Sequence, residues 1–312
     1  MIKKEVVRIS ERTLFAMKED YSVQKQIDEH AVARYFNGAE GSSAAAMSMM
    51  AHEHNLPSNA AKYRLRKELS IISGWLGAVG EAGRVLDVGC GAGAWVEIFA
   101  NCYKSVIGIE NSPLMVEAAR KRVAHLSNAQ ILQGDGRHDL PTGQFDLIFL
   151  GGLCMYLDSG DVVELLQSLK SRLSEGGLLI LRESTVRKGV LLVGGEYQAI
   201  YRSVDMYSQL FEEVGISCLE VRQNSGYANM VIAEEFIDFR RKWLPFLPKD
   251  STFLGYLTWW ILRGITPISF WALPQVVSKL NIPWPRLQNH FFKLQLINSE
   301  SLPQDTIFGR VS

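Results

Sequence analysis

A carboxylate followed closely by alternating glycines is the feature of this sequence that most directly suggests chemistry. Asp87 lies within the short apolar run 85–88, and Gly89, Gly91 and Gly93 follow it. Because glycine has no Cβ atom, the backbone amides of such a turn can approach a ligand closely. The residues after the turn have helical spacing, so free amides of a helix N-terminus would point at the same place. We therefore expect a polar cofactor to bind at the end of a buried strand.

A second carboxylate, Glu110, stands 21 residues after Gly89, at the end of the next apolar run. At this distance a carboxylate can accept hydrogen bonds from a ribose diol. Gly89, Gly91 and Ala94 also satisfy the dinucleotide pattern G-x-G-x-x-A, which leaves NAD or FAD as an alternative. Asp87 favours S-adenosylmethionine, because a nearby anion attracts the ammonium group of that cofactor and repels a pyrophosphate.

The stretch Val85–Gly93 resembles the first motif of the class I S-adenosylmethionine-dependent methyltransferases, and the similarity extends over residues 64–235. The resemblance implies S-adenosylmethionine as the cofactor, S-adenosylhomocysteine as the product and an acidic residue, Asp135, near the adenine. Beside the three glycines, it implies cofactor contacts from Asp87, Cys90, Glu110, Asn111, Asp135, Gly136 and Leu150.

Short apolar runs alternate with helical segments along this region, which requires a mainly parallel sheet with both faces covered. We expect a Rossmann-like α/β fold with seven strands, of which the last is antiparallel. The last two strands are expected at Ile216–Arg222 and Tyr227–Ala233, joined as a hairpin by the turn residues Asn224-Ser225-Gly226. The methyltransferase domain would then occupy residues 84–235.

Residues 1–83 are expected to form an N-terminal helical lid. The apolar spacing of Ala60–Leu76 predicts a helix with Ser58 or Asn59 as its N-cap. The resemblance implies that this helix closes over the cofactor, so that Tyr63 and Arg64 would contact the cofactor or a substrate anion. The small-residue segment Gly38–Met50 suits a mobile lid or a disordered connector. His52 and His54 flank an acidic residue without further ligands nearby, so no metal site is expected.

Residues 236–312 form an aromatic and proline-rich extension that holds five of the seven tryptophans. Between Asp238 and Ser312 there are nine Lys or Arg and four Asp or Glu, a positive excess that suits contact with anionic headgroups. Peripheral membrane contact and a cap over the substrate pocket both remain open. A membrane span is disfavoured, because Arg263, Pro267 and Pro274 interrupt the apolar stretch.

The acceptor is expected above the ends of the fourth and fifth strands. Glu183 is the leading candidate for deprotonating it, because a carboxyl group that closes a buried strand has a raised pKa. Tyr156 and His138 are further catalytic candidates. A wall for a phosphate or sugar is predicted from Tyr197, Tyr201 and Arg202, with the two tyrosines on one helix face.

These features predict methyl transfer to a small or medium acceptor such as a natural product, glycan or lipid-linked compound. A protein methyltransferase and a non-catalytic, cofactor-binding regulatory subunit are the alternatives. The formal charge of zero gives no reason to expect nucleic acid as a partner, and the sequence does not predict an oligomeric state. Four isolated cysteines and an N-terminus without a signal-peptide core indicate a cytoplasmic protein, with membrane association through residues 236–312 left open.

Overall fold

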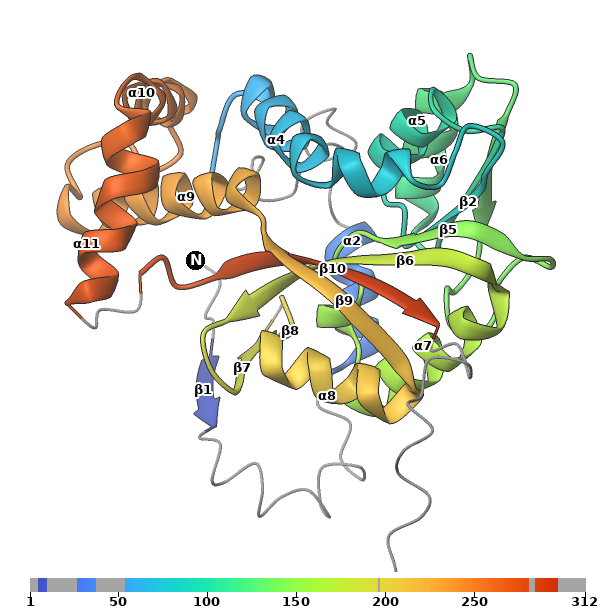
Figure 1. Ribbon diagram of the computed structural model, residues 1–312. Coiled ribbons are helices and arrows are strands. Elements are labelled where there is room, and N and C mark those ends of the chain that lie inside the picture. The colour runs from blue at the N-terminus through green and yellow to red at the C-terminus, as the bar shows by residue number, and fades with distance from the viewer. Residues whose placement is uncertain (1–4, 10–26, 38–53, 196, 281–283, 297–312) are drawn as a thin grey trace, which may run out of the picture.

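The computed structural model describes residues 5–9, 27–37, 54–195, 197–280 and 284–296. These residues form a central mixed sheet with helices on both faces (Figure 1). The expected α/β architecture is confirmed.

Seven strands make the main part of the sheet, in the order β4-β3-β2-β5-β6-β10-β9. The first five of these are parallel, and their bounds are β4 (Ala129–Gln133), β3 (Ser105–Glu110), β2 (Arg84–Val88), β5 (Phe145–Leu150) and β6 (Leu173–Val186). The strand β10 (Gln288–Leu296) runs antiparallel between β6 and β9 (Ile216–Gln223). The sheet therefore has the antiparallel last strand that we expected.

The position of that last strand in the sequence differs from our prediction. Residues 227–233 do not form a strand, because they lie in the helix α9 (Ser225–Trp243). Asn224 caps this helix by accepting a hydrogen bond from the Tyr227 amide at 3.1 Å, so the predicted turn residues begin a helix instead. A short apolar run cannot separate strand from helix by periodicity, and here Met230 and Ala233 pack with helical spacing. The predicted boundary at residue 235 falls inside α9.

Three further strands extend the sheet beyond the end of β6. They are β8 (Ala199–Ser203), which is parallel to β6, and β7 (Val190–Gly194) and β1 (Glu5–Ile9), which follow in antiparallel pairing. Tyr197 and Tyr201 lie in the turn before β8 and in β8 itself, and the helix that we predicted for them is not formed. A ten-stranded sheet results.

Two apolar layers sandwich the sheet, as alternation along the strands requires. One face packs on α7 (Ser159–Arg172) and α8 (Val204–Val214), and the other on α4 (Ser58–Gly77), α5 (Ala94–Ala100) and α6 (Pro113–Val123). Adjacent residues of β10 pack on opposite faces of the sheet. Phe292 belongs to the apolar layer with α8, and Phe291 to the layer with α5. The predicted helix over Ala60–Leu76 is confirmed, although Pro57 precedes its first turn in place of the expected cap.

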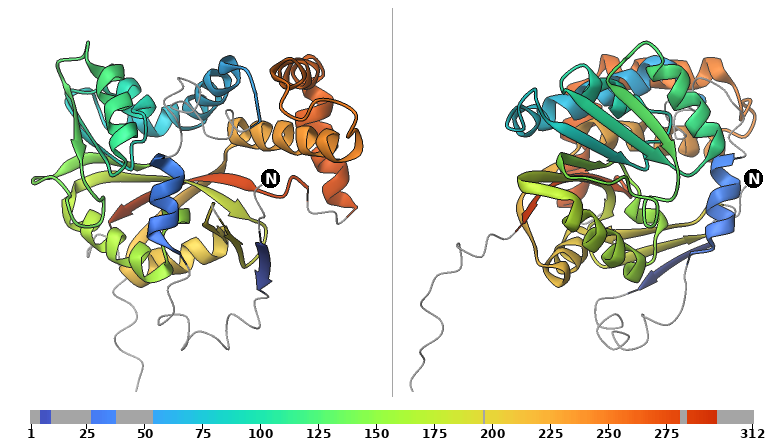
Figure 2. Two further views of the ribbon diagram at one scale, coloured as in Figure 1. Left: turned by 180° about the vertical axis from the view of Figure 1, so that it is seen from behind. Right: turned by 90° about the vertical axis from the view of Figure 1, so that its right-hand side faces the viewer.

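The remaining helices lie at the edge of this sandwich. The short helix α2 (Glu29–Asn37) sits between the α5–α6 side and a separate lobe (Figure 2). That lobe contains α10 (Thr252–Gly264), the π-helical turn η2 (Pro267–Ala272) and α11 (Leu273–Lys279). It is anchored through Trp259 and Leu262, which pack with α4 and α9 around Tyr63 and Met230. Within the described ranges, no helix combines the length and apolar character needed to cross a membrane.

The position of β10 in the sheet predicts that the C-terminal part of the chain is required for stability. Phe292 is fully buried, so Phe292→Ala should lower the free energy of unfolding by about 3–5 kcal/mol through lost burial and a residual cavity. Urea unfolding followed by circular dichroism would measure this. Phe246→Ala is the matched control, because that ring is 78% exposed and its loss should change stability by less than about 0.5 kcal/mol. Equal effects of the two changes would contradict the placement of β10.

Candidate functional site

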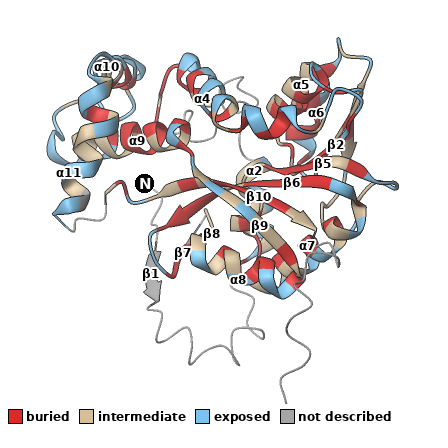
Figure 3. Cartoon of the chain, in the orientation of Figure 1, coloured by how far each residue is buried: buried red, intermediate tan, exposed pale blue. Residues whose placement is uncertain are grey.

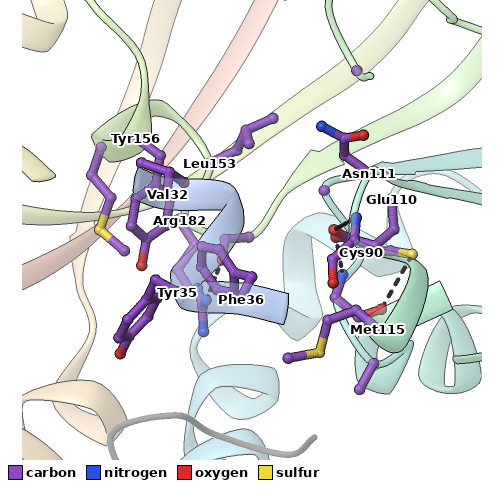
Figure 4. Close-up of a pocket in the computed structure, with 18 of the residues that line it drawn as sticks. Val32, Tyr35, Phe36, Cys90, Glu110, Asn111, Met115, Leu153, Tyr156 and Arg182 are labelled. Carbon is purple, nitrogen blue, oxygen red and sulfur yellow. Dashed lines mark hydrogen bonds between the residues drawn. The ribbon is translucent and has the colours of Figure 1, made fainter. Parts of the chain in front are cut away.

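A cavity of about 740 Å³ lies at the carboxyl ends of the parallel strands. In open α/β sheets this edge is where ligands bind, because the loops there face a crevice. The glycine turn after β2, the ends of β3 and β4 and the loop after β5 line one part of it. Residues of α2 and α9 line the rest. In Figure 4, Cys90 and Glu110 gather at one end, Tyr156 lies at the other, and Phe36 lies between them.

The glycine turn has the backbone conformation that its sequence requires. Gly89, Gly91 and Gly93 have φ angles of 68°, 53° and 75°, which residues with a Cβ atom rarely adopt. The amides of Gly89 and Cys90 both donate to the carbonyl of Ile109, at 2.9 and 3.0 Å, and so fix the turn against β3. Gly89, Cys90 and Gly91 line the cavity. Gly93 instead packs against α6 and begins α5.

Glu110 is held at the end of β3 by two backbone amides. Its Oε2 accepts from Gly91 N and its Oε1 from Ser112 N, both at 2.9 Å. Burial raises the pKa of this carboxyl, and these hydrogen bonds oppose the shift. Each oxygen of a carboxylate can accept a second hydrogen bond. The carboxylate is thus oriented toward the cavity with acceptor capacity to spare, and Asn111 lies beside it at the rim.

Asp87 is the deepest carboxylate of the cavity wall, with 2% of its surface exposed. Desolvation raises its pKa to about 8, the Arg182 guanidinium acts to lower it, and Glu110 acts to raise it further. At neutral pH the protonated form is therefore favoured, and a cation bound beside it would favour the ionised form.

Arg182 enters the cavity from β6 and is fixed by a buried charge network. Its guanidinium contacts both oxygens of Glu68 on α4, at 3.1 and 3.2 Å, and donates to the carbonyl of Gly151. Glu68 is fully buried, lies 3.5 Å from Arg64 Nε and accepts from Asn224 Nδ2 at 2.9 Å. The network ties α4, β6 and the start of α9 together around the cavity. Arg64 and Arg182 both line it.

The loop after β4 lines the same end of the cavity as the glycine turn. Asp135 and Gly136 of this loop line the cavity. Asp135 Oδ2 lies 2.7 Å from Arg137 and Arg137 lies 3.0 Å from Glu29 of α2. Burial acts to raise the pKa of Asp135, but the hydrogen bonds from Arg137 lower it overall. Asp135 is therefore an anion braced by an arginine.

The helix α2 crosses the cavity and is attached at both of its ends. Glu29 pairs with Arg137 at its start, and Asn37 accepts from Ser112 Oγ at 2.9 Å at its end. Between them, Tyr35 packs edge-on against Tyr197, and Phe36 against Tyr156, with ring centroids 4.9 and 5.1 Å apart. These contacts make α2 a cover over the cavity.

Four tyrosines form the end of the cavity that faces away from the glycine turn. The hydroxyls of Tyr197 and Tyr201 lie 2.8 Å apart, and Tyr156 lies 3.4 Å from Tyr197. Tyr227, on α9, accepts from Ser184 Oγ at 2.9 Å. Burial raises the pKa of Tyr197, Tyr201 and Tyr227, so these phenols are neutral hydrogen-bonding groups.

The Glu183 side chain lies on the opposite side of the sheet from the cavity. Adjacent residues of a strand point to opposite faces, so Arg182 faces the cavity and Glu183 faces the core. Glu183 accepts from the Cys154 amide at 3.0 Å and from Tyr207 at 3.4 Å. Desolvation raises its pKa to about 7. This geometry supports a role in holding the loop after β5.

The structure also places four other predicted site residues outside the cavity lining. Arg202 is fully buried and donates to the carbonyls of Cys154 and Leu157, both at 2.8 Å. Leu150 is fully buried in the core, and His138 is exposed. The fourth, Tyr63, accepts from Asn229 at 3.0 Å within the α4–α9–α10 packing.

One group of potential metal ligands lies at the rim. His54 Nε2 is 3.5 Å from both Glu234 and Asp238, whose side chains line the cavity. Asp238 is also 3.6 Å from the Arg241 guanidinium. His52 and the segment Gly38–Met50 lie outside the described residues.

Several lining residues had no sequence signal that we used. Tyr35 and Phe36 belong to a nine-residue helix without a recognisable motif. Glu234 directly follows the strand that we predicted at Tyr227–Ala233, and the structure places it in α9. Arg137 stands two residues after Asp135 and donates a hydrogen bond to it. This close spacing of opposite charges could have been used to predict that Arg137 lies at the site.

Comparison with known proteins agrees with this geometry. Residues 85–177 match the family model described as a methyltransferase domain. The chain is 31% identical to a protein-L-isoaspartate O-methyltransferase of Nitrobacter winogradskyi over 106 residues, which is 33% of this chain and 45% of that protein. It is 32% identical to nodulation protein S of Bradyrhizobium diazoefficiens over 95 residues, which is 30% of this chain and 44% of that protein. The chain thus spans less than half the length of these relatives.

Two solved structures share the fold over most of the chain. An S-adenosylmethionine-dependent methyltransferase of Leishmania major superposes with a TM-score of 0.57 at 16% identity, covering 91% of this chain and 92% of that one. The O-methyltransferase of a polyketide synthase multienzyme of Brevibacillus brevis gives 0.51 at 17% identity, covering 95% and 82%. The glycine turn, Asp87 and Glu110 all lie within residues 85–177, and this part of the chain matches the methyltransferase domain model.

Proposed function

We propose that this protein transfers a methyl group from S-adenosylmethionine to a small or medium acceptor that binds in the tyrosine-lined end of the cavity. The observation that carries the proposal is the buried Asp87 beside the glycine turn, in a cavity that continues past Arg182 to four tyrosines. Such a cavity has room for a cofactor and an acceptor side by side, since ligand sites occupy about 300–1,000 Å³.

The residues of the glycine end fit the proposed cofactor. Asp87 offers a desolvated carboxylate to an ammonium group, and Glu110 offers two oriented oxygens to a ribose diol. Gly89, Cys90 and Gly91 would provide close backbone contact. We further propose that Asn111, Asp135 and Gly136 surround the adenine. Leu150 supports β5 from within the core, and Gly93 supports the turn.

The bound cofactor supplies a methyl group on a sulfonium, which is already activated for transfer. The protein then has to align the acceptor and exclude water. Phe36 and Tyr35 are placed to do both, because α2 lies across the cavity between its two ends. The hydroxyls of Tyr156, Tyr197 and Tyr201 would orient polar groups of the acceptor by hydrogen bonding.

The lining at the tyrosine end favours an acceptor with an apolar or aromatic body and polar substituents. Met155, Val193 and Leu287 provide apolar surface there, and Arg286 and Glu235 provide charge at the rim. A natural product, a glycan or a lipid-linked compound would meet these requirements. The cover provided by α2 disfavours a folded protein as the acceptor, because only a narrow group could pass it.

For acceptors that must lose a proton, we propose Glu234 as the general base. It lines the cavity near Tyr201 and Tyr227 and is 3.5 Å from the buried His54. Tyr156 remains a candidate for orienting the acceptor. Glu183 and His138 do not line the cavity, so we assign Glu183 a positioning role.

The charge on Asp87 predicts a specific pH dependence for cofactor binding. Binding of S-adenosylhomocysteine, whose ammonium group needs the ionised carboxylate, should release a proton from a group with pKa about 8. The apparent dissociation constant should therefore rise about tenfold as the pH falls from 7 to 6. Calorimetric titration in two buffers of different ionisation enthalpy would measure both the affinity and the released proton.

Asp87→Asn is the matched control for that titration. It should weaken binding by about 1.5–3 kcal/mol through loss of a charge-assisted contact, and it should also abolish the proton release and the pH dependence below pH 7. Retained affinity in the variant, or binding of NAD in preference to S-adenosylhomocysteine, would overturn the cofactor assignment.

The cover formed by α2 predicts slow release of the cofactor product. Phe36→Ala removes the edge-on contact with Tyr156, which should accelerate dissociation of S-adenosylhomocysteine about two- to tenfold. Stopped-flow displacement would measure the rate. Phe239→Ala, at an exposed ring outside the cavity lining, should leave the rate unchanged. An unchanged rate for Phe36→Ala would show that α2 does not retain the ligand.

The proposed base predicts a separation of turnover from binding. Glu234→Gln should lower the rate of methyl transfer to a hydroxylated acceptor by about 10²–10⁴-fold while leaving the affinity for S-adenosylhomocysteine unchanged. The rate would be followed as S-adenosylhomocysteine formation on the best acceptor from a panel of phenols, sugars and lipid-linked compounds. Glu235→Gln, at the neighbouring carboxyl that accepts from Arg286 N, is the control and should have a smaller effect.

Two results would count against these assignments. Normal turnover in Glu234→Gln would remove Glu234 as the base. Tight binding of S-adenosylhomocysteine without turnover of any acceptor in the panel would instead favour the non-catalytic, cofactor-binding alternative.

A further inference from the structure

The lobe that follows α9 has an unusual surface. Among the described residues, 17 large hydrophobic side chains are exposed, and 14 of them lie between residues 239 and 280. Monomeric proteins expose single hydrophobic residues commonly but contiguous apolar patches rarely. This concentration therefore points to a surface that is covered in the working state of the protein.

Five of these exposed residues form one face of α10. Gly255, Trp259 and Leu262 face inward and anchor the helix. The opposite face is also apolar, at the spacing i, i+3, i+4, i+7, i+8, where solvated helices carry polar residues. It consists of Phe253, Tyr256, Leu257, Trp260 and Ile261, and is continued by Ile265, Ile268 and Trp271. Figure 3 shows exposed residues along α10 and α11. We call this set the apolar face.

Basic residues outnumber acidic ones around the apolar face. Residues 238–280 contain six Lys or Arg and two Asp, of which Asp250 is exposed and lies 3.5 Å from Arg241. Lys249 and Lys279 are exposed on the lobe, and Lys242 is exposed at the end of α9, where its Nζ lies 5.7 Å from the centre of the exposed Trp243 ring. Aromatic rings beside flexible basic side chains suit the boundary of a bilayer, where apolar tails meet anionic headgroups.

We propose that the apolar face docks on an anionic lipid surface, with α10 lying in the plane of the interface. Its 13 residues span about 20 Å, so the helix lies on the bilayer and does not cross it. A second copy of the chain fits less well. In a twofold interface the same patch meets itself, which would bring together the six Lys or Arg of residues 238–280 from each copy, against two Asp from each.

This surface adjoins the cavity through α9. The end of α9 carries the exposed Phe239 and Trp243, while Val231 and Glu234 of the same helix line the cavity. An amphiphilic acceptor could therefore reach the cavity from the lipid surface. That consequence rests on the proposed function, whereas the docking itself does not, and lipid binding can be measured without turnover.

The test is flotation of the full chain with vesicles of phosphatidylcholine alone or mixed with phosphatidylglycerol. The protein should float with the mixed vesicles and less with the neutral ones, and high salt should weaken the association. The double variant Phe253→Ser, Trp260→Ser should reduce partitioning at least about tenfold. Leu219→Ser is the matched control, because Leu219 is 52% exposed on β9, away from the lobe, and its loss should leave partitioning unchanged.

Urea midpoints and S-adenosylhomocysteine affinity would show that the variants are folded, and these should match the unaltered protein. Equal flotation of the double variant and the unaltered protein would overturn the proposal. So would a failure to bind mixed vesicles together with a concentration-dependent dimer that the double variant abolishes, since a second copy would then be the occupant.

Discussion

The buried salt bridge between Glu68 and Arg182 is the interaction on which the site depends. A guanidinium taken out of water must be compensated, and here the compensating carboxylate comes from α4, the helix that directly precedes β2 in the sequence. Glu68 also accepts a hydrogen bond from Asn224 at the start of α9. Arg182 also donates a hydrogen bond to the carbonyl of Gly151 in the loop after β5. Three walls of the cavity are therefore positioned by one ion pair.

This ion pair also sets the electrostatics of the cofactor end. The Arg182 charge acts on Asp87, opposing the desolvation that raises the pKa of that carboxyl. Desolvation outweighs this effect of Arg182, so the pKa of Asp87 remains far above its ordinary value. The ionised form of the Asp87 carboxylate is therefore stabilised when a cationic group of the ligand binds beside it. A fully exposed aspartate would lack this preference.

The sequence predicted what local chemistry determines. The glycine turn, Glu110 and the five parallel strands follow from short-range patterns, because the turn requires positive φ angles and buried strands require apolar runs. The contacts between segments far apart in the chain could not be predicted from the sequence. The seventh strand was placed at Tyr227–Ala233, whereas the chain first makes the helical segments α9, α10, η2 and α11 and returns to the sheet only at Gln288. Both segments are short, and the pairing of Gln288–Leu296 with β6 and β9 is a long-range contact that the local sequence does not reveal.

The candidate site was predictable at its cofactor end and much less so at its acceptor end. Cys90, Asn111 and Asp135 each follow the end of a parallel strand. The carboxyl ends of these strands meet at one edge of the sheet, where the cavity lies. The prediction that Glu183 lines the cavity was wrong, because adjacent residues of β6 point to opposite faces of the sheet. Arg182 therefore lines the cavity, and Glu183 does not. Tyr35 and Phe36 come from a helix far away in sequence, which no pattern connects to the tyrosines that it covers.

The connection between β9 and β10 has a consequence for how this protein can vary. Gln223 and His290 are paired neighbours on these antiparallel strands, so the whole segment between them is an insertion at the tip of a hairpin. Hairpin tips accept long insertions at a small entropic cost, since closure depends only weakly on loop length. This inserted segment therefore carries both a wall of the cavity and the lobe. Under the two proposals above, exchange of the inserted segment between related chains would change the acceptor that fits and the lipid contact in a single step, without altering the glycine turn.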